Sequence, residues 1–282
     1  MATWSILRGN DELLLTGRAP FDLLSVNGIG TATIRRMTGR APNQDGDTDL
    51  GFRLDPRVVN LVLFANAASL AAADAYRSQL YDVLKPFTGA VNLRCVRDDG
   101  AIRQIDGYPV GMIDAPVSDQ DRIWAAQKIA VQLRAAEPIW YDPQIKYWAA
   151  VGGAATGTSG FTVPMHVPWQ QTPNSYIDVT VSLAYAGSWA SYPIITFLGP
   201  LTSVSLENAT TGQVLDLPNL ALSAGEYVTI DLRYGHKTVV NQLGDNLIGQ
   251  LSDDSDLADW HLAPAPEASG GVNVLNLVVN AD

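Results

Sequence analysis

Residues 176–187 alternate apolar and polar side chains, with Ile177, Val179, Val181 and Leu183 at every second position. A period of two indicates a strand that buries one face and exposes the other. Shorter segments of the same kind follow, separated by turn residues and without a helical period between them. The second half of the chain therefore predicts a β-sandwich of the jelly-roll kind. The strands expected there are 176–187, 194–198, 203–207, 213–217, 227–232, 238–240 and 272–279.

The first half combines strand patterns with one helical pattern, which predicts a helix packed on a sheet. The helix is expected over residues 69–85, because Ser69 is a suitable N-cap and Pro86 ends the pattern. Its apolar stripe consists of Ala73, Tyr76, Leu80, Val83 and Leu84. Residues 31–38 predict a half-buried strand, and residues 41–50 predict a loop. The other strands expected are 12–15, 21–26, 57–65, 90–96, 101–109 and 121–135.

Charge divides the chain into two parts. Residues 1–150 carry sixteen basic and seventeen acidic side chains, whereas residues 152–282 carry two basic and twelve acidic ones. Nearly all of the net charge of −11 therefore lies on the second part. Residues 137–143 (EPIWYDP) end the first part, and the small residues of 151–160 (VGGAATGTSG) are typical of a linker. We expect two domains, at residues 1–150 and 151–282, each able to bury its own core.

The sequence gives no signal of secretion or of membrane insertion. No basic stretch followed by an apolar core opens the chain, and no apolar run is long enough to span a bilayer. The single cysteine, Cys95, cannot form an internal disulfide, which fits folding in a reducing cytoplasm. The net charge of −11 argues against nucleic acid as a partner, because phosphate binding requires clustered Lys and Arg.

Residues suited to catalysis are sparse. No two of the histidines, His166, His236 and His261, fall within four residues of each other, so the commonest zinc spacing is absent. The sequence also lacks the Gly-x-Ser-x-Gly turn of serine hydrolases and a phosphate-binding Gly-rich loop with Lys. These features predict a protein that is not an enzyme and that uses no metal or cofactor.

Two acidic clusters are candidates for cation sites. Residues 45–49 (DGDTD) place carboxylates two positions apart, which superficially suits a hard cation. The EF-hand pattern then fails, because Leu50 stands where Gly is needed and Pro56 stands where Glu is needed. Residues 253–256 (DDSD) are similar, so both clusters are interpreted as solvated loops. A hydrolase that uses Asp and Glu is a further alternative, but nothing in the sequence pairs its carboxylates.

Aromatic residues of the second half leave a carbohydrate-binding adhesion module as an alternative function. Exposed Trp and Tyr rings can stack on pyranose rings, and an acidic β-sandwich could present them. Packing in the core or at a subunit interface is the competing interpretation for each ring. The candidates for glycan contact are Trp169, Tyr185, Trp189 and Tyr192.

A series of short motifs runs in order along nearly the whole chain. In the first half these are 44–46 (QDG), 51–53 (GFR), 57–61 (RVVNL), 81–84 (YDVL), 103–105 (RQI) and 138–142 (PIWYD). In the second half they are 193–196 (PIIT), 206–212 (LENATTG), Leu222, 225–226 (GE), 229–231 (TID), 237–239 (KTV), 246–247 (NL) and 271–273 (GVN). Together they resemble the distal tail protein (Dit) family of long-tailed bacteriophages, within the phage tail-protein superfamily.

One segment departs from that family's pattern. The family usually has a compact Pro-Gly-x-Asn turn before its last strand, whereas this sequence has 264–271 (PAPEASGG). We therefore expect a longer closing loop.

The resemblance implies a mainly β fold and a structural role. The N-terminal domain would be β-barrel-like with one helix and would form a ring, usually a homohexamer. The C-terminal domain would be a jelly-roll or galectin-like β-sandwich that projects from the ring. The protein would be a baseplate component at the tail tip of the virion, made in the bacterial host cytoplasm and serving host attachment. Its partners would be itself, the tail tube protein, the tail hub protein and receptor-binding or side proteins.

A ring needs complementary surfaces on neighbouring copies. Basic residues cluster in the first half, and acidic residues near them could face them across subunit boundaries. Ordinary surface ion pairs of little energetic value are an equally open interpretation. The candidate ring-interface residues are Arg35, Arg36, Asp45, Asp47, Asp49, Arg53 and Arg57.

Overall fold

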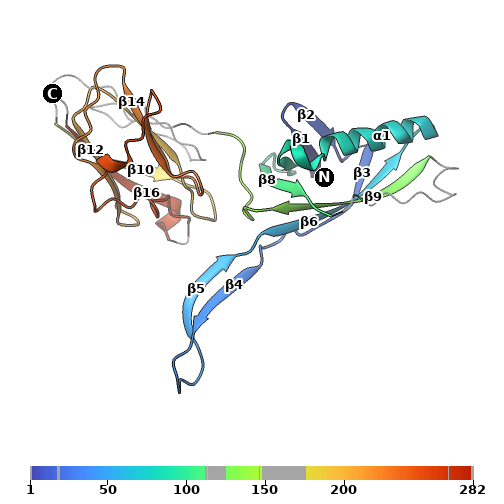
Figure 1. The fold of residues 1–282 in the computed structure, drawn as a ribbon, viewed down its shortest axis with the longest axis horizontal. Coiled ribbons are helices and arrows are strands. Elements are labelled where there is room, and N and C mark those ends of the chain that lie inside the picture. The colour runs from blue at the N-terminus through green and yellow to red at the C-terminus, as the bar shows by residue number, and fades with distance from the viewer. Residues whose placement is uncertain are drawn as a thin grey trace. The chain divides into compact units, whose positions relative to one another are not determined.

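The computed structural model describes residues 2–17, 20–111, 113, 125–145, 147, 176–265 and 267–280. It is mainly β, with short turns and one α-helix among the described residues (Figure 1). The chain divides into two compact units, Met1–Pro143 and Gln144–Asp282. The first unit ends at Pro143, which is the last residue of the segment 137–143. The expected linker at 151–160 lies outside the described residues.

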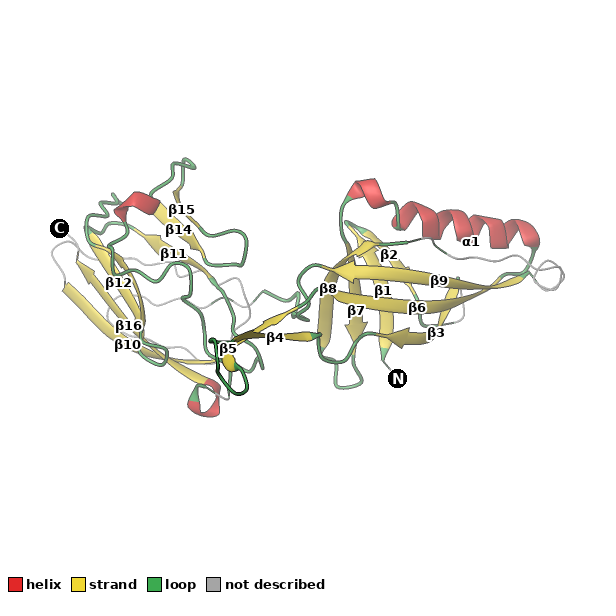
Figure 2. Cartoon of the chain, turned by 60° about the horizontal axis from the view of Figure 1, so that its bottom comes forward, coloured by secondary structure: helices red, strands yellow, loops and turns green. Residues whose placement is uncertain are grey.

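The first unit is built on an antiparallel sheet of seven strands in the order β2-β1-β7-β8-β9-β6-β3. Figure 2 shows β6 and β9 running across the direction of β1 and β7, so the sheet curves around its core. A turn at Asp98-Asp99-Gly100 joins β7 to β8, and Gly100 N donates to Arg97 O at 2.9 Å. The strands are β1 (Thr3–Arg8), β2 (Asp11–Leu14), β3 (Phe21–Asn27), β6 (Arg57–Asn66), β7 (Val91–Val96), β8 (Ile102–Pro109) and β9 (Ala126–Ala135).

Helix α1 (Leu70–Val83) follows β6 and covers one side of the sheet (Figure 2). Its start and end confirm the sequence interpretation. The side chain of Ser69 accepts a hydrogen bond from Ala72 N at 3.2 Å. Pro86 opens a separate 3₁₀ helix, Pro86–Thr88. The helix contacts β1, β2 and β6, so its apolar stripe faces the sheet and covers the core.

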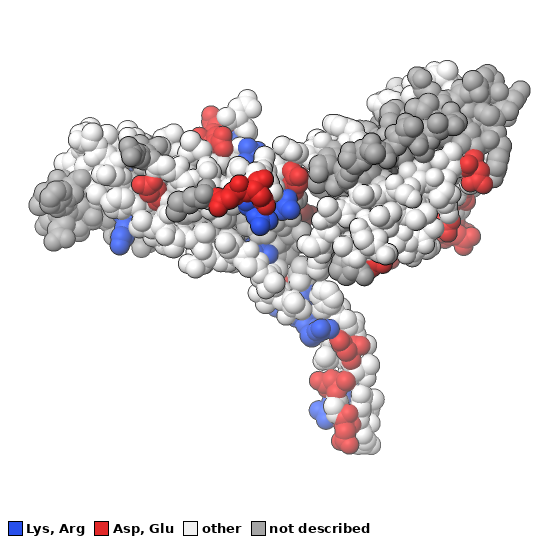
Figure 3. All heavy atoms as spheres, turned by 180° about the vertical axis from the view of Figure 1, so that it is seen from behind, with Lys and Arg blue, Asp and Glu red and all other residues white. Residues whose placement is uncertain are grey.

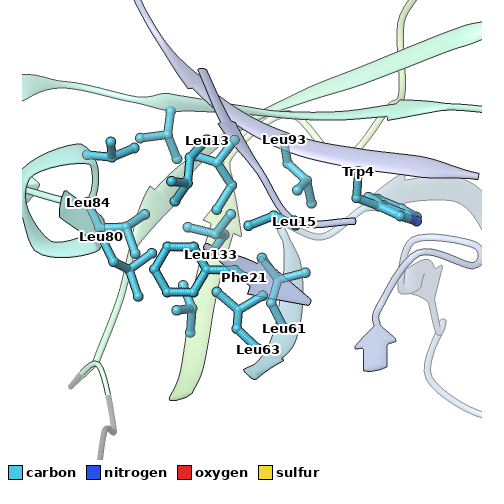
Figure 4. Close-up of a cluster of buried hydrophobic side chains, with 14 of the residues drawn as sticks. Trp4, Leu13, Leu15, Phe21, Leu61, Leu63, Leu80, Leu84, Leu93 and Leu133 are labelled. Atoms are coloured by element: carbon cyan, nitrogen blue, oxygen red, sulfur yellow. The ribbon is translucent and has the colours of Figure 1, made fainter. Parts of the chain in front are cut away.

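The core of the first unit lies between the curved sheet and α1 (Figure 4). Alternation along each strand supplies the inward side chains, as in β6, where Val59, Leu61 and Leu63 are buried. Each fully buried leucine contributes about 1.5–3 kcal/mol to the free energy of unfolding. The largest fully buried side chains are Ile6, Leu13, Leu15, Phe21, Leu61, Leu63, Leu80, Leu84 and Leu93.

Strands β4 (Ile34–Gly39) and β5 (Thr48–Leu54) form a separate two-stranded sheet. This hairpin, called here the arm (residues 34–54), extends away from the seven-stranded sheet (Figure 1). The predicted strand over 31–38 exists in part, but its half-buried character was wrong, because β4 is exposed along almost its whole length. The alternation in the sequence predicted the strand but not its exposure. No second layer among the described residues covers either of its faces. The loop expected over 41–50 is shorter, since β5 begins at Thr48.

The second unit is a β-sandwich. One sheet has the order β10-β16-β12-β13, and the other has the order β11-β14-β15. Side chains from both sheets enclose one apolar core, which includes the fully buried Trp260. The described part of the second half is thus a β-sandwich, as the sequence predicts. The strands are β10 (Tyr176–Ala184), β11 (Ile194–Leu198), β12 (Ser203–Asn208), β13 (Gln213–Leu217), β14 (Tyr227–Asp231), β15 (Thr238–Asn241) and β16 (Val272–Asn280).

A long connection from β15 to β16 is fastened to the sandwich by a buried asparagine. Asn273 Oδ1 accepts from Ala263 N at 2.7 Å, and Asn273 Nδ2 donates to Ala263 O at 3.0 Å. Asn208 Nδ2 also donates to His261 O at 2.8 Å. Both asparagines are buried, so these bonds satisfy polar groups that water does not reach. The connection contains a short 3₁₀ helix at Ile248–Gln250, and a second one, Ser269–Gly271, precedes β16.

Candidate interaction site

The arm gathers all the candidate ring-interface residues except Arg57. Its strands pair antiparallel, with Ile34 opposite Leu54 and Arg36 opposite Phe52. The register shifts between Arg36 and Thr38, which marks a bulge. A two-stranded hairpin by itself is at best marginally stable in water. The stability of such an arm therefore depends on the other surfaces that contact it.

Charged side chains run along the arm in both signs (Figure 3). Arg35 pairs with Asp55 at 3.0 Å, and Arg36 pairs with Asp49 at 2.9 Å. These pairs are exposed, so each contributes about 0–1 kcal/mol. Arg36 also lies 5.7 Å from the centre of the Phe52 ring. Within one chain, Arg36 of β4 therefore pairs with Asp49 of β5, and Arg35 pairs with Asp55, which follows β5.

The arm also exposes apolar side chains. Register places Ile34, Phe52 and Leu54 on one face of the arm, whereas the bulge turns Leu50 to the other face, beside Gly39. Ile34 is 57% exposed and Leu50 is 62% exposed. Apolar side chains grouped on a surface in this way mark protein interaction sites. These apolar side chains on the two faces of the arm, residues 34, 50, 52 and 54, are together called here the apolar arm surface.

The remaining charged candidates have different positions. Asp45 and Asp47 are exposed in the connection between the two strands, and Arg53 is exposed on β5. Arg57 is only 8% exposed at the start of β6. Its guanidinium donates to Pro138 O and Gly28 O at 2.9 Å each, and to Gly30 O at 2.5 Å. Arg57 therefore acts within its own chain instead of facing outward.

The aromatic candidates of the second unit are largely engaged within it. Tyr185 packs against the core, and its hydroxyl donates to Trp189 O at 2.6 Å. The ammonium of Lys237 lies 4.6 Å from the centre of the Tyr192 ring, and the centres of the Tyr192 and His261 rings are 5.9 Å apart. Burial raises the pKa of Tyr192, with nearby Asp259 adding to the shift. The structure thus places Tyr192 in a packed cluster, whereas Trp189 remains exposed. Trp169 lies outside the described residues.

The acidic clusters and histidines form no metal centre in the described part of the chain, where no group of three His, Cys, Asp or Glu is placed to hold a metal ion. Asp256 instead accepts a hydrogen bond from Val214 N at 2.9 Å and fixes a loop. His166 lies outside the described residues. Cys95 is buried in β7, and burial raises the pKa of its thiol. Among the described residues, no helix is both long and apolar enough to cross a membrane.

Sequence reasoning missed the contacts that hold the last residues of the first unit, 136–143, called here the exit segment. Trp140 meets Trp4 edge to face, with 6.1 Å between ring centres. Tyr141 exchanges two backbone hydrogen bonds with Gln104 of β8, at 2.8 and 2.9 Å. Composition alone marked this segment as a boundary. Its aromatic residues were the only signal that it packs against the sheet.

A curved sheet with one helix, an exposed arm and a following β-sandwich define a two-unit, mainly β protein. This is a Dit-like fold. The whole chain aligns with SPP1 Dit (gp 19.1), described as a paradigm of the hub adsorption apparatus in Gram-positive infecting phages. The two share 13% sequence identity with a TM-score of 0.63, over 99% of this chain and 98% of that chain.

Two structures of the phage p2 baseplate in its activated conformation, with Sr and with Ca, also align with the chain. Each has 8% identity over 100% of this chain and 98% of that chain, with TM-scores of 0.43 and 0.44 respectively. No protein-family model and no curated protein matches the sequence.

Proposed function

We propose that this chain is a structural component of a phage tail tip, and that copies of it form a ring which joins the tail tube to the hub and the receptor-binding apparatus. The observation that carries the proposal is the Dit-like fold, which extends over nearly the full length of both this chain and SPP1 Dit. The role is geometric, as adaptor and channel, and requires no catalytic group or cofactor.

The arm supports the ring. It exposes Ile34 and Leu50 on a hairpin that has no core of its own. A second copy of this chain would cover the apolar arm surface and shield the ion pairs beside it from water. Contacts between different surfaces of neighbouring copies close into a ring when the rotation between copies is suitable. In this proposal the arm is the main contact between neighbours, and a homohexamer is the expected ring.

The remaining partners follow from the same role. The tail tube protein would bind one side of the ring and the tail hub protein the other, with receptor-binding or side proteins at the rim. The second unit would be displayed outward. Nearly all of the net charge of −11 lies on residues 152–282, which would keep this part soluble and disfavour contact with DNA. The protein would reside at the virion tail tip after synthesis in the bacterial host cytoplasm.

A matched pair of variants of the full chain tests the ring. Leu50→Asp places a carboxylate on the apolar arm surface, whereas Leu243→Asp makes the same change at a residue of the second unit that is 79% exposed. Burial of one leucine is equivalent to at least about a tenfold change in association constant, and a buried carboxylate adds to the loss.

Size-exclusion chromatography with light scattering measures the outcome. We expect rings for the wild type and for Leu243→Asp, and protomers for Leu50→Asp. A wild type that stays a protomer at high concentration contradicts the ring. Rings of Leu50→Asp that are as stable as those of the wild type contradict the arm as its main contact.

A further inference from the structure

Arg57 holds together two parts of the first unit that are far apart in the sequence. Its Nε donates to the carbonyl of Pro138 in the exit segment, at 2.9 Å. Its Nη1 donates to the carbonyls of Gly28 and Gly30, at 2.9 and 2.5 Å. Residues 28–30 begin the connection from β3 to β4 and are called here the arm root. One guanidinium therefore connects the arm root to the exit segment.

The arm root is also locked to β6 through its backbone. Gly28 has a φ of +85°, and a Cβ at this position would lie 2.1 Å from the carbonyl oxygen of Val58. Only glycine allows the chain to approach β6 so closely. The arm root is thus held beside Arg57, which begins β6 immediately after the return from the arm.

The exit segment is fixed on the other side of Arg57. It follows β9, whose last residue, Ala135, pairs with Arg57 in the sheet. Beyond Pro138, Trp140 packs on Trp4, and Tyr141 pairs with Gln104. The chain then continues into the second unit. A segment that composition marks as a boundary is therefore fastened to the sheet at successive residues.

The chemistry of Arg57 favours a link rather than an ion pair. Arg57 has no carboxylate partner among the described residues, and all three hydrogen bonds go to backbone carbonyls. Burial lowers the pKa of its guanidinium, without a nearby acid to oppose the shift. The guanidinium is planar and its donors have fixed directions, so Nε and Nη1 cannot move independently. A displacement of the arm root must therefore strain the bond to Pro138.

We infer that Arg57 is a positioning residue that couples the arm root to the exit segment, so that the two open and close as one unit. Movement at the base of the arm is thereby carried to the segment from which the second unit continues. This inference rests on contacts within the first unit and is independent of the proposed ring.

Amide hydrogen exchange of the full-length protein, read by mass spectrometry, tests this coupling. The variant Arg57→Lys keeps the charge but cannot direct donors to both groups of carbonyls. Arg134→Lys is the matched control, because Arg134 is exposed on the neighbouring strand β9. We expect Arg57→Lys to speed exchange of the peptides covering 21–30 and 136–143 by about tenfold or more, as loss of hydrogen bonds to a charged group implies. Peptides of β7 and β8 and the control variant should be unchanged.

The inference is overturned if Arg57→Lys accelerates only one of the two segments, or neither. Should this variant fail to fold, the wild type decides the question in low concentrations of urea. Coupling predicts that both segments exchange through one opening event, with the same opening constant and the same dependence on urea. Separate opening constants, or opening only together with the whole unit, would show that Arg57 does not link them as a distinct unit.

Discussion

Tyr141 donates its phenolic hydrogen to Asp106, with 2.6 Å between the two oxygen atoms. The same hydroxyl accepts a hydrogen bond from Gln104 Nε2 at 2.8 Å. The backbone of Tyr141 also pairs with Gln104 of β8 as an isolated antiparallel bridge. Side chain and main chain thus hold the exit segment at the same point.

Removal of this hydroxyl should loosen the exit segment. We expect Tyr141→Phe to lower the free energy of local opening there by about 1 kcal/mol, because two hydrogen bonds are lost at a site that water partly reaches. Tyr81→Phe is the control, since Tyr81 is exposed on α1, and it should change the value by a few tenths at most. Hydrogen exchange of residues 139–142 measures both variants. Equal exchange in the two variants would contradict the structural role of the hydroxyl.

The same tyrosine predicts a dependence on alkaline pH. Burial, together with the hydrogen bond to Asp106, raises the pKa of Tyr141 above its ordinary value of 10.0. The folded state therefore holds this proton at a pH where the unfolded chain releases it. The contribution to stability is complete below the unfolded pKa and is lost as pH rises through the folded pKa.

Wild type should accordingly lose more stability than Tyr141→Phe as the pH is raised above about 10. Urea unfolding of the two proteins, compared at matched pH values, measures this difference and cancels the titration of other groups. A difference that stays constant through this range would show that the hydroxyl is not protected by folding.

In the second unit, Asn273 offers the sharpest test of a buried polar contact. Asn273→Ala leaves the N–H and the carbonyl of Ala263 without their partners in a buried position. We expect a loss of roughly 2 kcal/mol or more in the stability of the sandwich, because unsatisfied buried groups cost about 1–3 kcal/mol each. Asn219→Ala, at an exposed position, should change stability by less than about 0.5 kcal/mol. Exchange rates of β16 amides distinguish the two variants, and similar rates would contradict the contact.

Local signals in the sequence predicted most of the elements. Ser69 and Pro86 limit α1 because capping and helix termination depend on nearby residues alone. The alternation through Val181 and Leu183 predicted β10, since a period of two places every second side chain in the core. Such patterns report the element together with the face that it buries, provided that another layer covers that face.

The arm shows where this reasoning fails. Ile34 and Arg36 lie two positions apart, on the face that a half-buried strand would bury. Both are nevertheless exposed in the single chain. Periodicity identifies a strand but cannot show which surface will cover it. Arg57 could not be assigned its contacts either, because its acceptors are backbone carbonyls, which every residue carries. Only the folded chain brings Gly28, Gly30 and Pro138 to the same side chain.

Negative-stain electron microscopy of the purified full-length protein tests the central claim most directly. We expect closed rings around a central channel, with sixfold symmetry in the class averages. Isolated protomers at high protein concentration, with no rings in any class, would contradict it.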